Sequence, residues 1–129
     1  CAPARARGIK TGPIHNGMSF VGGKWVWGNY REPDLSKCQF WGTDCYDKNS
    51  KGVGIYAEWL TYAKATGLPI VIGEHGQPQG PSQAQYAADA RSLFISEGVY
   101  AACWWHQQFT GNPNYVMSAA TQSAWFGLV

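Results

Sequence analysis

The sequence predicts an α/β protein built from parallel strands that alternate with helices. Its clearest strand covers residues 68–74, an apolar and mostly β-branched run that ends on the carboxylate of Glu74. A run without polar interruptions is typical of a strand buried on both faces of a parallel sheet. Apolar residues at helical spacing lie on both sides of this run in the chain. Strands and helices that alternate at this spacing predict right-handed βαβ units.

The first third of the chain predicts two strands separated by irregular segments. Residues 1–17 are rich in proline, glycine and small side chains, so we expect an irregular lead-in there. A strand is expected over 19–27, where Gly22-Gly23 predicts either a bulge or a tight turn between two shorter strands. Residues 29–37 predict a loop or a single helical turn, and residues 39–46 predict the second strand.

The rest of the chain alternates helix and strand. Gly67 and Gly98 stand where two helices should end, because glycine readily adopts the left-handed conformation of a helix C-cap. Ser82 and Gln85 have the spacing of a capping box, which predicts the start of the second helix. The expected elements are a helix over about 53–66, the strand 68–74, a helix from about 82 to 97, a strand over 99–105 and a short helix over about 118–126.

Composition bounds the class of protein. The 129 residues suffice for one domain, and 45% apolar against 14% charged residues indicates a globular chain. A net charge of +2 without a basic run argues against nucleic acid as the main partner. We expect no membrane span, since no apolar stretch is long enough. The opening residues 1–7 do not resemble a signal peptide, so either a signal was removed or the chain belongs to a longer one; an extracellular or secreted location is expected.

The cysteines and aromatic residues leave alternatives open. Cys103 lies in an apolar run and predicts a buried thiol, whereas a Cys38–Cys45 bridge is possible but not decided by sequence. No C-x-x-C pair or other zinc spacing is present. Aromatic residues make up 15% of the chain, which suits stacking on sugar rings or, alternatively, an aromatic core.

Polar side chains follow three of the predicted strands, at the edge where parallel sheets bind ligands. In a regular strand, Glu74 shares one face with Ile70 and Ile72, so its carboxylate would crown a row of core side chains. A carboxylate in that place is either a functional group, with a catalytic nucleophile favoured, or a side chain that simply reaches solvent. No glycine-rich phosphate loop follows a strand, which disfavours nucleotide binding.

Residues 40–46, 68–76 and 99–105, read together, resemble strands six, seven and eight of retaining (β/α)₈-barrel glycoside hydrolases of the cellulase and mannanase superfamily. The resemblance covers roughly residues 38–126 and rests on the ordered set of three motifs. It implies that Glu74 is the nucleophile and that Tyr46 is its hydrogen-bond partner. It also implies that Trp104 or Trp105 forms a platform for the sugar, although strand parity allows only one of them to face inward.

Further rim residues follow from the same resemblance. Asp44 and His75 flank the rim and, with His106, are candidates for substrate binding, although both histidines are expected to face solvent from loops. The resemblance also implies an acid/base glutamate at the end of strand four. The sole candidate is Glu32, which is separated from Asn29 by two residues and lies too close to the strand at 39–46 to leave room for the fifth strand.

We therefore expect residues 1–129 to form one half-barrel domain, the C-terminal half of a TIM-type barrel with about four strands and three helices. A full barrel needs roughly 200–250 residues, so another polypeptide segment or a second copy is expected to complete it. The implied activity is retaining hydrolysis of a β-linked polysaccharide, without a metal or an organic cofactor. The alternative is a non-catalytic carbohydrate-binding or structural module, as in a cell-wall-directed or virion assembly. A third possibility, a fragment of an unrelated α/β hydrolase or transferase, is disfavoured because no serine or cysteine stands in the context of a nucleophile elbow.

Overall fold

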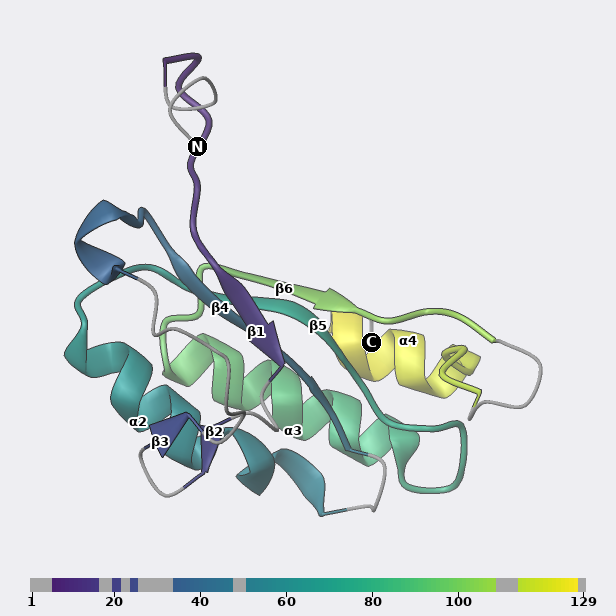
Figure 1. Cartoon of the computed structure of the whole chain (residues 1–129). Helices are drawn as coiled ribbons and strands as arrows, with labels where there is room; N and C mark the ends of the chain where they lie inside the picture. Colours follow the sequence, from purple (N-terminus) through teal and green to yellow (C-terminus); the bar gives the residue numbers. More distant parts are fainter. Residues whose placement is uncertain are drawn as a thin grey trace.

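The main sheet is parallel throughout and orders its strands as they follow one another in the chain (Figure 1). The computed structural model describes residues 6–16, 20–21, 24–25, 34–47, 51–108 and 114–127. The sheet has four strands in the order β1-β4-β5-β6, and each neighbouring pair is parallel. The strands are β1 (Ile14–Asn16), β4 (Trp41–Tyr46), β5 (Ile70–Gly76) and β6 (Ala101–Trp104). The predicted α/β class with a parallel sheet is thus confirmed.

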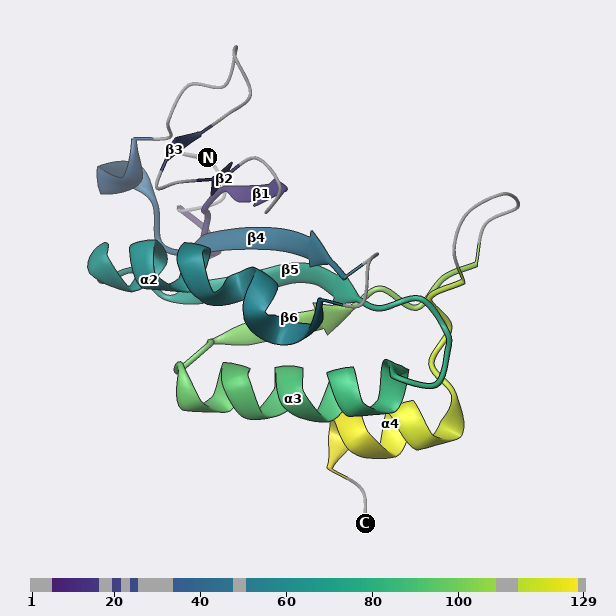
Figure 2. The same cartoon turned by 90° about the horizontal axis from the view of Figure 1, so that it is seen from below.

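Three α-helices lie on one side of this sheet (Figures 1 and 2). They are α2 (Ala57–Ala65), which continues the 3₁₀ segment η3 (Gly52–Tyr56), α3 (Gln83–Ser96) and α4 (Ala119–Phe126). Helices α2 and α3 connect strands that are immediate neighbours in the sheet. Because βαβ crossovers share one hand, connections between successive neighbouring strands place their helices on the same face.

The core fills the space between the sheet and these helices. Trp41 of β4 packs edge-on against the rings of Trp59 and Tyr62 of α2, with ring centroids 5.9 and 5.4 Å apart. The core cluster consists of Trp41, Cys45, Tyr56, Trp59, Leu60, Ala63, Ile70, Ile72, Tyr86, Ala90 and Phe94. The opposite face of the sheet is covered by none of the described helices, and Ile14 of β1 is 44% exposed. That uncovered face is where the strands carry functional candidates.

The lead-in contains a strand that the sequence did not predict. Residues 1–17 were expected to be irregular, and this expectation is wrong for β1, which pairs with β4 from Ile14↔Gly42 to Asn16↔Asp44. Two further bonds extend the contact, since Gln39 N donates to Thr11 O (2.8 Å) and Gly42 N donates to Pro13 O (2.9 Å). A strand this short leaves no pattern of alternation, so pairing with β4 rather than local sequence decides it.

The strand predicted over 19–27 is a separate pair of short strands. β2 (Phe20–Val21) and β3 (Lys24–Trp25) pair antiparallel and form their own two-stranded sheet. Of the two alternatives for the glycine pair, two shorter strands are therefore correct. In the segment predicted as a loop or a helical turn, residues 29–33 lie outside the described part, and a 3₁₀ turn, η2, forms at Leu35–Lys37.

The ends of the helices agree with the prediction, but one predicted capping bond does not form. Gly67 and Gly98 both have φ of +68°, the left-handed conformation that ends α2 and α3. The capping box at Ser82 is wrong: Ser82 makes no side-chain cap, and its hydroxyl donates to Gln77 Oε1 at 3.0 Å instead. Ser118 does cap α4, because its hydroxyl oxygen accepts a bond from Thr121 N at 3.1 Å.

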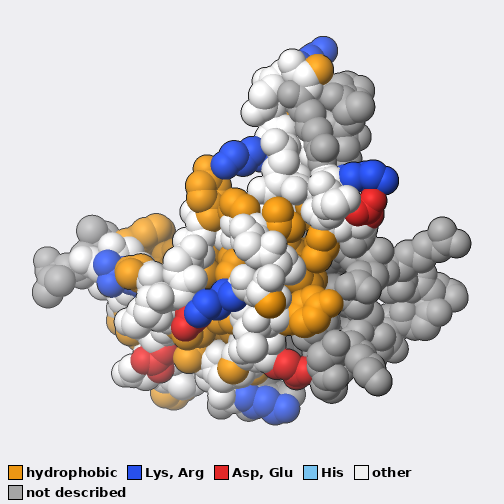
Figure 3. Space-filling model, turned by 90° about the vertical axis from the view of Figure 1, so that its left-hand side faces the viewer, with side chains coloured by type: hydrophobic (Ala, Val, Ile, Leu, Met, Phe, Trp, Pro, Cys, Tyr) orange, Lys and Arg blue, Asp and Glu red, His pale blue; other side chains and the backbone are white. Residues whose placement is uncertain are grey.

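Three cysteines of the described structure are free thiols. The prediction that Cys103 is buried is wrong, since β6 is an edge strand and Cys103 is exposed. Cys38 and Cys45 are free and form no bridge. Figure 3 shows the left-hand side of the molecule as drawn in Figure 1. On this side, lysine, arginine and acidic side chains are interspersed with hydrophobic ones. Within the described ranges, no helix is both long and apolar enough to cross a bilayer.

Candidate functional site

A bulge in β5 decides which way Glu74 points. β4 pairs Thr43 with Ile72 but Asp44 with Glu74, so Gly73 is an extra residue on β5; the β5–β6 register shifts in the same place. A bulge turns the following side chains to the opposite face. Ile72 is fully buried under the helices, whereas Glu74 is only half-buried and bonds to Tyr46 on the uncovered face. The prediction that Glu74 shares the face of Ile72 is therefore wrong.

Tyr46 and Glu74 form the central contact of the site. Tyr46 is the last residue of β4, and its hydroxyl donates a hydrogen bond to Glu74 Oε2. Burial raises the pKa of the Tyr46 phenol far above its ordinary value, and the bond to the Glu74 carboxylate raises it further. Tyr46 therefore stays protonated at every physiological pH and acts as a permanent donor to one oxygen of Glu74.

Two aromatic rings frame Tyr46. Trp105 lies edge-on to the Tyr46 ring with a centroid distance of 6.4 Å, and Tyr115 lies edge-on at 5.4 Å. Trp105 is half-buried, and its backbone N–H donates to His75 O at 2.7 Å. The ring contact places Trp105 on the same side of the sheet as Tyr46. Parity thus selects Trp105 as the inward-facing tryptophan of the pair.

Trp104 belongs to the helix side of the sheet. Its ring lies 5.9 Å from that of Tyr86 on α3 and 6.0 Å from that of Trp125 on α4. Its indole N–H donates to Tyr115 O at 3.0 Å, which ties β6 to the segment before α4. Trp104 is therefore not placed to serve as a sugar platform, because its ring packs under the helices.

His75 is also on the helix side, contrary to expectation. It was expected to face solvent on the rim, but its side chain is fully buried. Aromatic rings from two helices and β6 surround the imidazole at centroid distances between 4.5 and 6.3 Å: Trp125, Trp104, Phe94 and Tyr86. Burial lowers the pKa of the imidazole to about 3, so it is neutral at physiological pH. A side chain in this place cannot contact a substrate.

The other predicted rim residues differ in their placement. His106 is exposed, as expected, and its Nδ1 accepts a bond from Met117 N at 3.3 Å. Asp44 is half-buried on β4 and stands opposite Glu74 in the register. Glu32, the candidate acid/base, lies outside the described residues.

Asp47 and Gln77 are structural supports that sequence reasoning missed. The buried Asp47 carboxylate accepts bonds from Lys51 N and Gly52 N, both at 2.7 Å, and from Gln77 Nε2 at 2.9 Å. Asp47 N also donates to Gly76 O at 2.9 Å. These bonds join the ends of β4 and β5 directly beyond Tyr46 and Glu74. The signal was an aspartate opening a polar loop, where its side chain typically bonds nearby backbone N–H groups.

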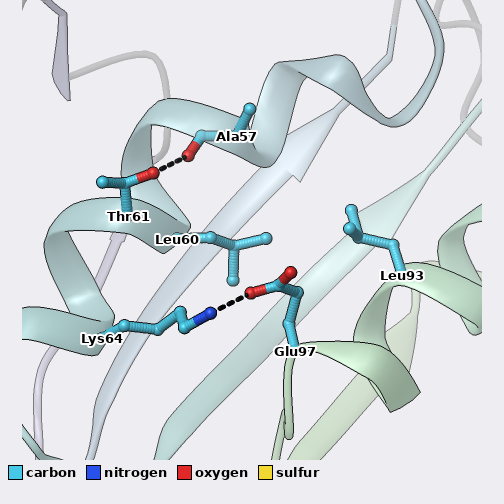
Figure 4. Close-up of a pocket in the computed structure, with 6 residues that line it drawn as sticks. All are labelled: Ala57, Leu60, Thr61, Lys64, Leu93 and Glu97. Carbon is cyan, nitrogen blue, oxygen red and sulfur yellow. Dashed lines mark hydrogen bonds and ion pairs between the residues drawn. The ribbon is translucent and has the colours of Figure 1, made fainter.

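A cleft of the described structure lies away from this site. It has a volume of about 330 Å³ and lies between α2 and α3, on the opposite side of the sheet from Glu74 (Figure 4). A salt bridge between Lys64 Nζ and Glu97 Oε2 (2.7 Å) crosses its wall. Its lining of helix residues offers no group suited to catalysis beyond this paired charge. In the described part of the chain, no cluster of three His, Cys, Asp or Glu side chains could hold a metal ion.

The arrangement suits chemistry at a carboxylate. At the C-terminal edge of a parallel sheet, Glu74 is oriented by the phenol of Tyr46 and stands opposite a second carboxyl group, and the Tyr46 ring in turn contacts the indole of Trp105. A carboxylate held in this way can attack an electrophilic carbon, and an indole can stack on the apolar face of a sugar ring. No family model matches the chain, and no curated protein matches it.

Proposed function

We propose that the chain is the C-terminal part of a retaining glycoside hydrolase that acts on a β-linked polysaccharide, with Glu74 as its nucleophile. The observation that carries this proposal is the hydrogen bond from Tyr46 to Glu74 at the C-terminal edge of the sheet. Ligands of parallel (β/α) proteins bind at that edge. An oriented carboxylate there has the geometry of a nucleophile rather than that of a side chain reaching solvent.

The sheet further supports a barrel half. Its strands follow the order of the chain, its helices lie on one face, and its other face carries Tyr46 and Glu74. A closed (β/α)₈ barrel has the same sequential order, with helices outside and functional groups at the C-terminal ends of the strands. β1 and β6 are edges of this sheet. We propose that another polypeptide segment, or a second copy of the chain, pairs with these edges and completes the barrel.

In this mechanism, Glu74 attacks the anomeric carbon and forms a glycosyl ester while a separate carboxylic acid protonates the leaving oxygen. Water then hydrolyses the ester, and the second carboxylate takes the proton from that water. Tyr46 holds the attacking carboxylate in place, and Trp105 supports the sugar ring. The acid/base group would come from the completing segment, because the two carboxyl groups need to be about 5–5.5 Å apart across the bound sugar.

The test uses substrates that do not need the missing acid. A 2,4-dinitrophenyl β-glycoside has a leaving group that departs without protonation, so the nucleophile alone can form the ester. With a set of such glucosides, mannosides and xylosides, we expect a burst of one equivalent of dinitrophenolate per chain. Mass spectrometry should then find the glycosyl group on the peptide that contains Glu74. A burst that persists in Glu74→Gln would refute the assignment of the nucleophile.

The second candidate is a carbohydrate-binding module without catalysis. It is favoured by one observation: in the described residues, the carboxyl group opposite Glu74 is that of Asp44, whose Oδ1 is buried and so is badly placed to protonate a substrate. Retained binding of soluble β-glycan, together with no burst in any glycoside of the set, would favour this candidate.

Two neighbouring tryptophans provide a matched pair of variants. Trp105→Ala should weaken binding of a soluble β-glycan roughly tenfold by removing the aromatic contact, with little change in folding. Trp104→Ala should instead lower the free energy of unfolding by roughly 3 kcal/mol, because it empties a site packed against His75 and two helices. Isothermal titration calorimetry and urea denaturation measure the two effects. The opposite distribution of effects would show that Trp104 is the platform.

A further inference from the structure

Asp44 and Glu74 place two carboxyl groups side by side with different surroundings. They are register partners on β4 and β5, and neighbouring strands lie only about 4.8 Å apart. Glu74 receives the Tyr46 hydroxyl on one oxygen, whereas Asp44 Oδ1 is buried and has no hydrogen-bond partner among the residues that the structure describes. Two close carboxyl groups cannot both ionise without strong repulsion. The surroundings therefore decide which of the two carries the charge.

Gly73 provides the space in which Asp44 lies. A Cβ atom at this position would stand 2.5 Å from Asp44 Oδ1 and 2.7 Å from Ile14 Cγ2, closer than atoms can approach. The Asp44 carboxyl group therefore lies against the backbone of the bulge, beneath Glu74, with the apolar side chain of Ile14 as a further wall. The bulge glycine thus both turns Glu74 to the uncovered face and leaves room for its neighbour.

Among the side chains that the structure describes, those that face Asp44 do not stabilise a negative charge well. The charge of Glu74 on β5 opposes it, Tyr46 and Cys45 on β4 are neutral, and β1 contributes Ile14. The Glu74 backbone N–H is the donor that favours ionised Asp44, but burial and then the charge of Glu74 outweigh it and raise the pKa of Asp44. The two ion pairs of the described structure, Lys37–Asp34 and Lys64–Glu97, do not involve Asp44.

We propose that Asp44 is a positioning residue for the nucleophile: when the two carboxyl groups hold one proton between them, that proton lies on Asp44 and the negative charge lies on the Glu74 carboxylate that Tyr46 orients. This inference rests on the proposed role of Glu74 and deepens it. Asp44 is thereby removed from the substrate contacts, because its inner oxygen lies against Gly73 rather than at the open edge.

The protonated neighbour has a consequence for the reaction. A second charge beside Glu74 would repel the first and draw a proton onto the pair, which would leave the attacking oxygen protonated and unreactive. With the proton stored on Asp44, the attacking oxygen is free of it. When it holds the proton, Asp44 is neutral and has nearly the same shape as asparagine.

The test is a carboxyl ¹³C NMR titration of the chain labelled at aspartate Cγ, which needs neither substrate nor turnover. Asp44→Asn removes one signal and so assigns it, and the signal of exposed Asp89 on α3 serves as a reference in the same spectra. We expect the Asp44 signal to titrate with a midpoint above the ordinary aspartate value of 3.8. In Glu74→Gln, the midpoint should move down, because the opposing charge is gone.

Two results would overturn the proposal: an Asp44 midpoint at or below 3.8 in the unaltered chain, or a midpoint that does not move in Glu74→Gln. Neither depends on hydrolysis. If no burst is seen with the dinitrophenyl glycosides but the Asp44 midpoint is raised and depends on Glu74, the role of Glu74 as nucleophile is refuted. The proposal that Asp44 takes the shared proton then still holds. A normal midpoint with a successful burst would refute the charge sharing alone.

Discussion

Glu74→Gln is expected to lower turnover of a β-linked polysaccharide by at least about a thousandfold in the enzyme that contains this chain, because the amide cannot form the glycosyl ester. Binding of the polysaccharide should persist, since Gln keeps the shape of the side chain and Trp105 is unchanged. Initial rates of reducing-sugar release and calorimetric binding measure the two properties. Unchanged turnover would exclude Glu74 as the nucleophile.

Control variants separate chemistry from folding. Glu97→Gln removes a carboxylate of similar exposure from the far side of the sheet, where it pairs with Lys64, and should keep turnover within about twofold. Glu74→Ala with added azide and an activated glycoside should form a glycosyl azide of inverted configuration, because azide enters from the vacated side.

Tyr46→Phe removes one bond to a charged group and should lower turnover roughly 10- to 100-fold.

His75 is expected to make folding strongly dependent on pH. Its imidazole is neutral in the folded chain, with a pKa lowered by burial to about 3, but it binds a proton in the unfolded chain at about 6.5. Below pH 6.5 the unfolded state therefore binds the proton that the folded state excludes. The free energy of unfolding contributed by this group is complete above pH 6.5 and falls by about 1.4 kcal/mol per pH unit down to about pH 3.

Urea denaturation of the unaltered chain and of His75→Leu at several pH values between 4 and 8 measures this contribution. The difference in stability between the two proteins should shrink or reverse as the pH falls, since Leu has no proton to bind. Phe94→Leu is the matched control: it loosens the same aromatic surroundings, in which the two rings lie 5.2 Å apart, but keeps the imidazole. It should therefore lower stability at every pH and keep the slope of the unaltered chain. A slope for His75→Leu equal to that of the unaltered chain would contradict the prediction.

Most elements of the fold followed from local signals in the sequence. The strands at 39–46, 68–74 and 99–105 and the three helices between and after them were predictable, because apolar periodicity and C-cap glycines mark them clearly. Two features were not. β1 depends on bonds that β4 provides from elsewhere in the chain, and the capping box expected at the correctly predicted start of α3 does not form, because the Ser82 hydroxyl donates to Gln77 instead.

The pairing of Tyr46 with Glu74 could be predicted from the sequence, but the faces on which the neighbouring candidates lie could not. The Tyr46 and Glu74 positions came from the resemblance, and the structure brings the two side chains into contact. The faces of Glu74 and His75 could not be read from alternation, because the bulge at Gly73 reverses the alternation within the predicted strand. The same reversal exchanges the expected environments: Glu74 lies on the open face, and His75 lies among aromatic rings. Asp44 and Asp47 owe their roles to partners on β5, which only the register reveals.

The position of β5 also determines how firmly Glu74 is held as the protein fluctuates. β5 is hydrogen-bonded to a strand on each side, whereas β6 is an edge strand. Segments bonded on both sides open only with the whole domain, while edges open in smaller and less costly fluctuations. Glu74 therefore belongs to the last part of the sheet to open. Trp105, just beyond β6, can loosen earlier for as long as no further strand pairs with β6, while the Glu74 carboxylate stays in register.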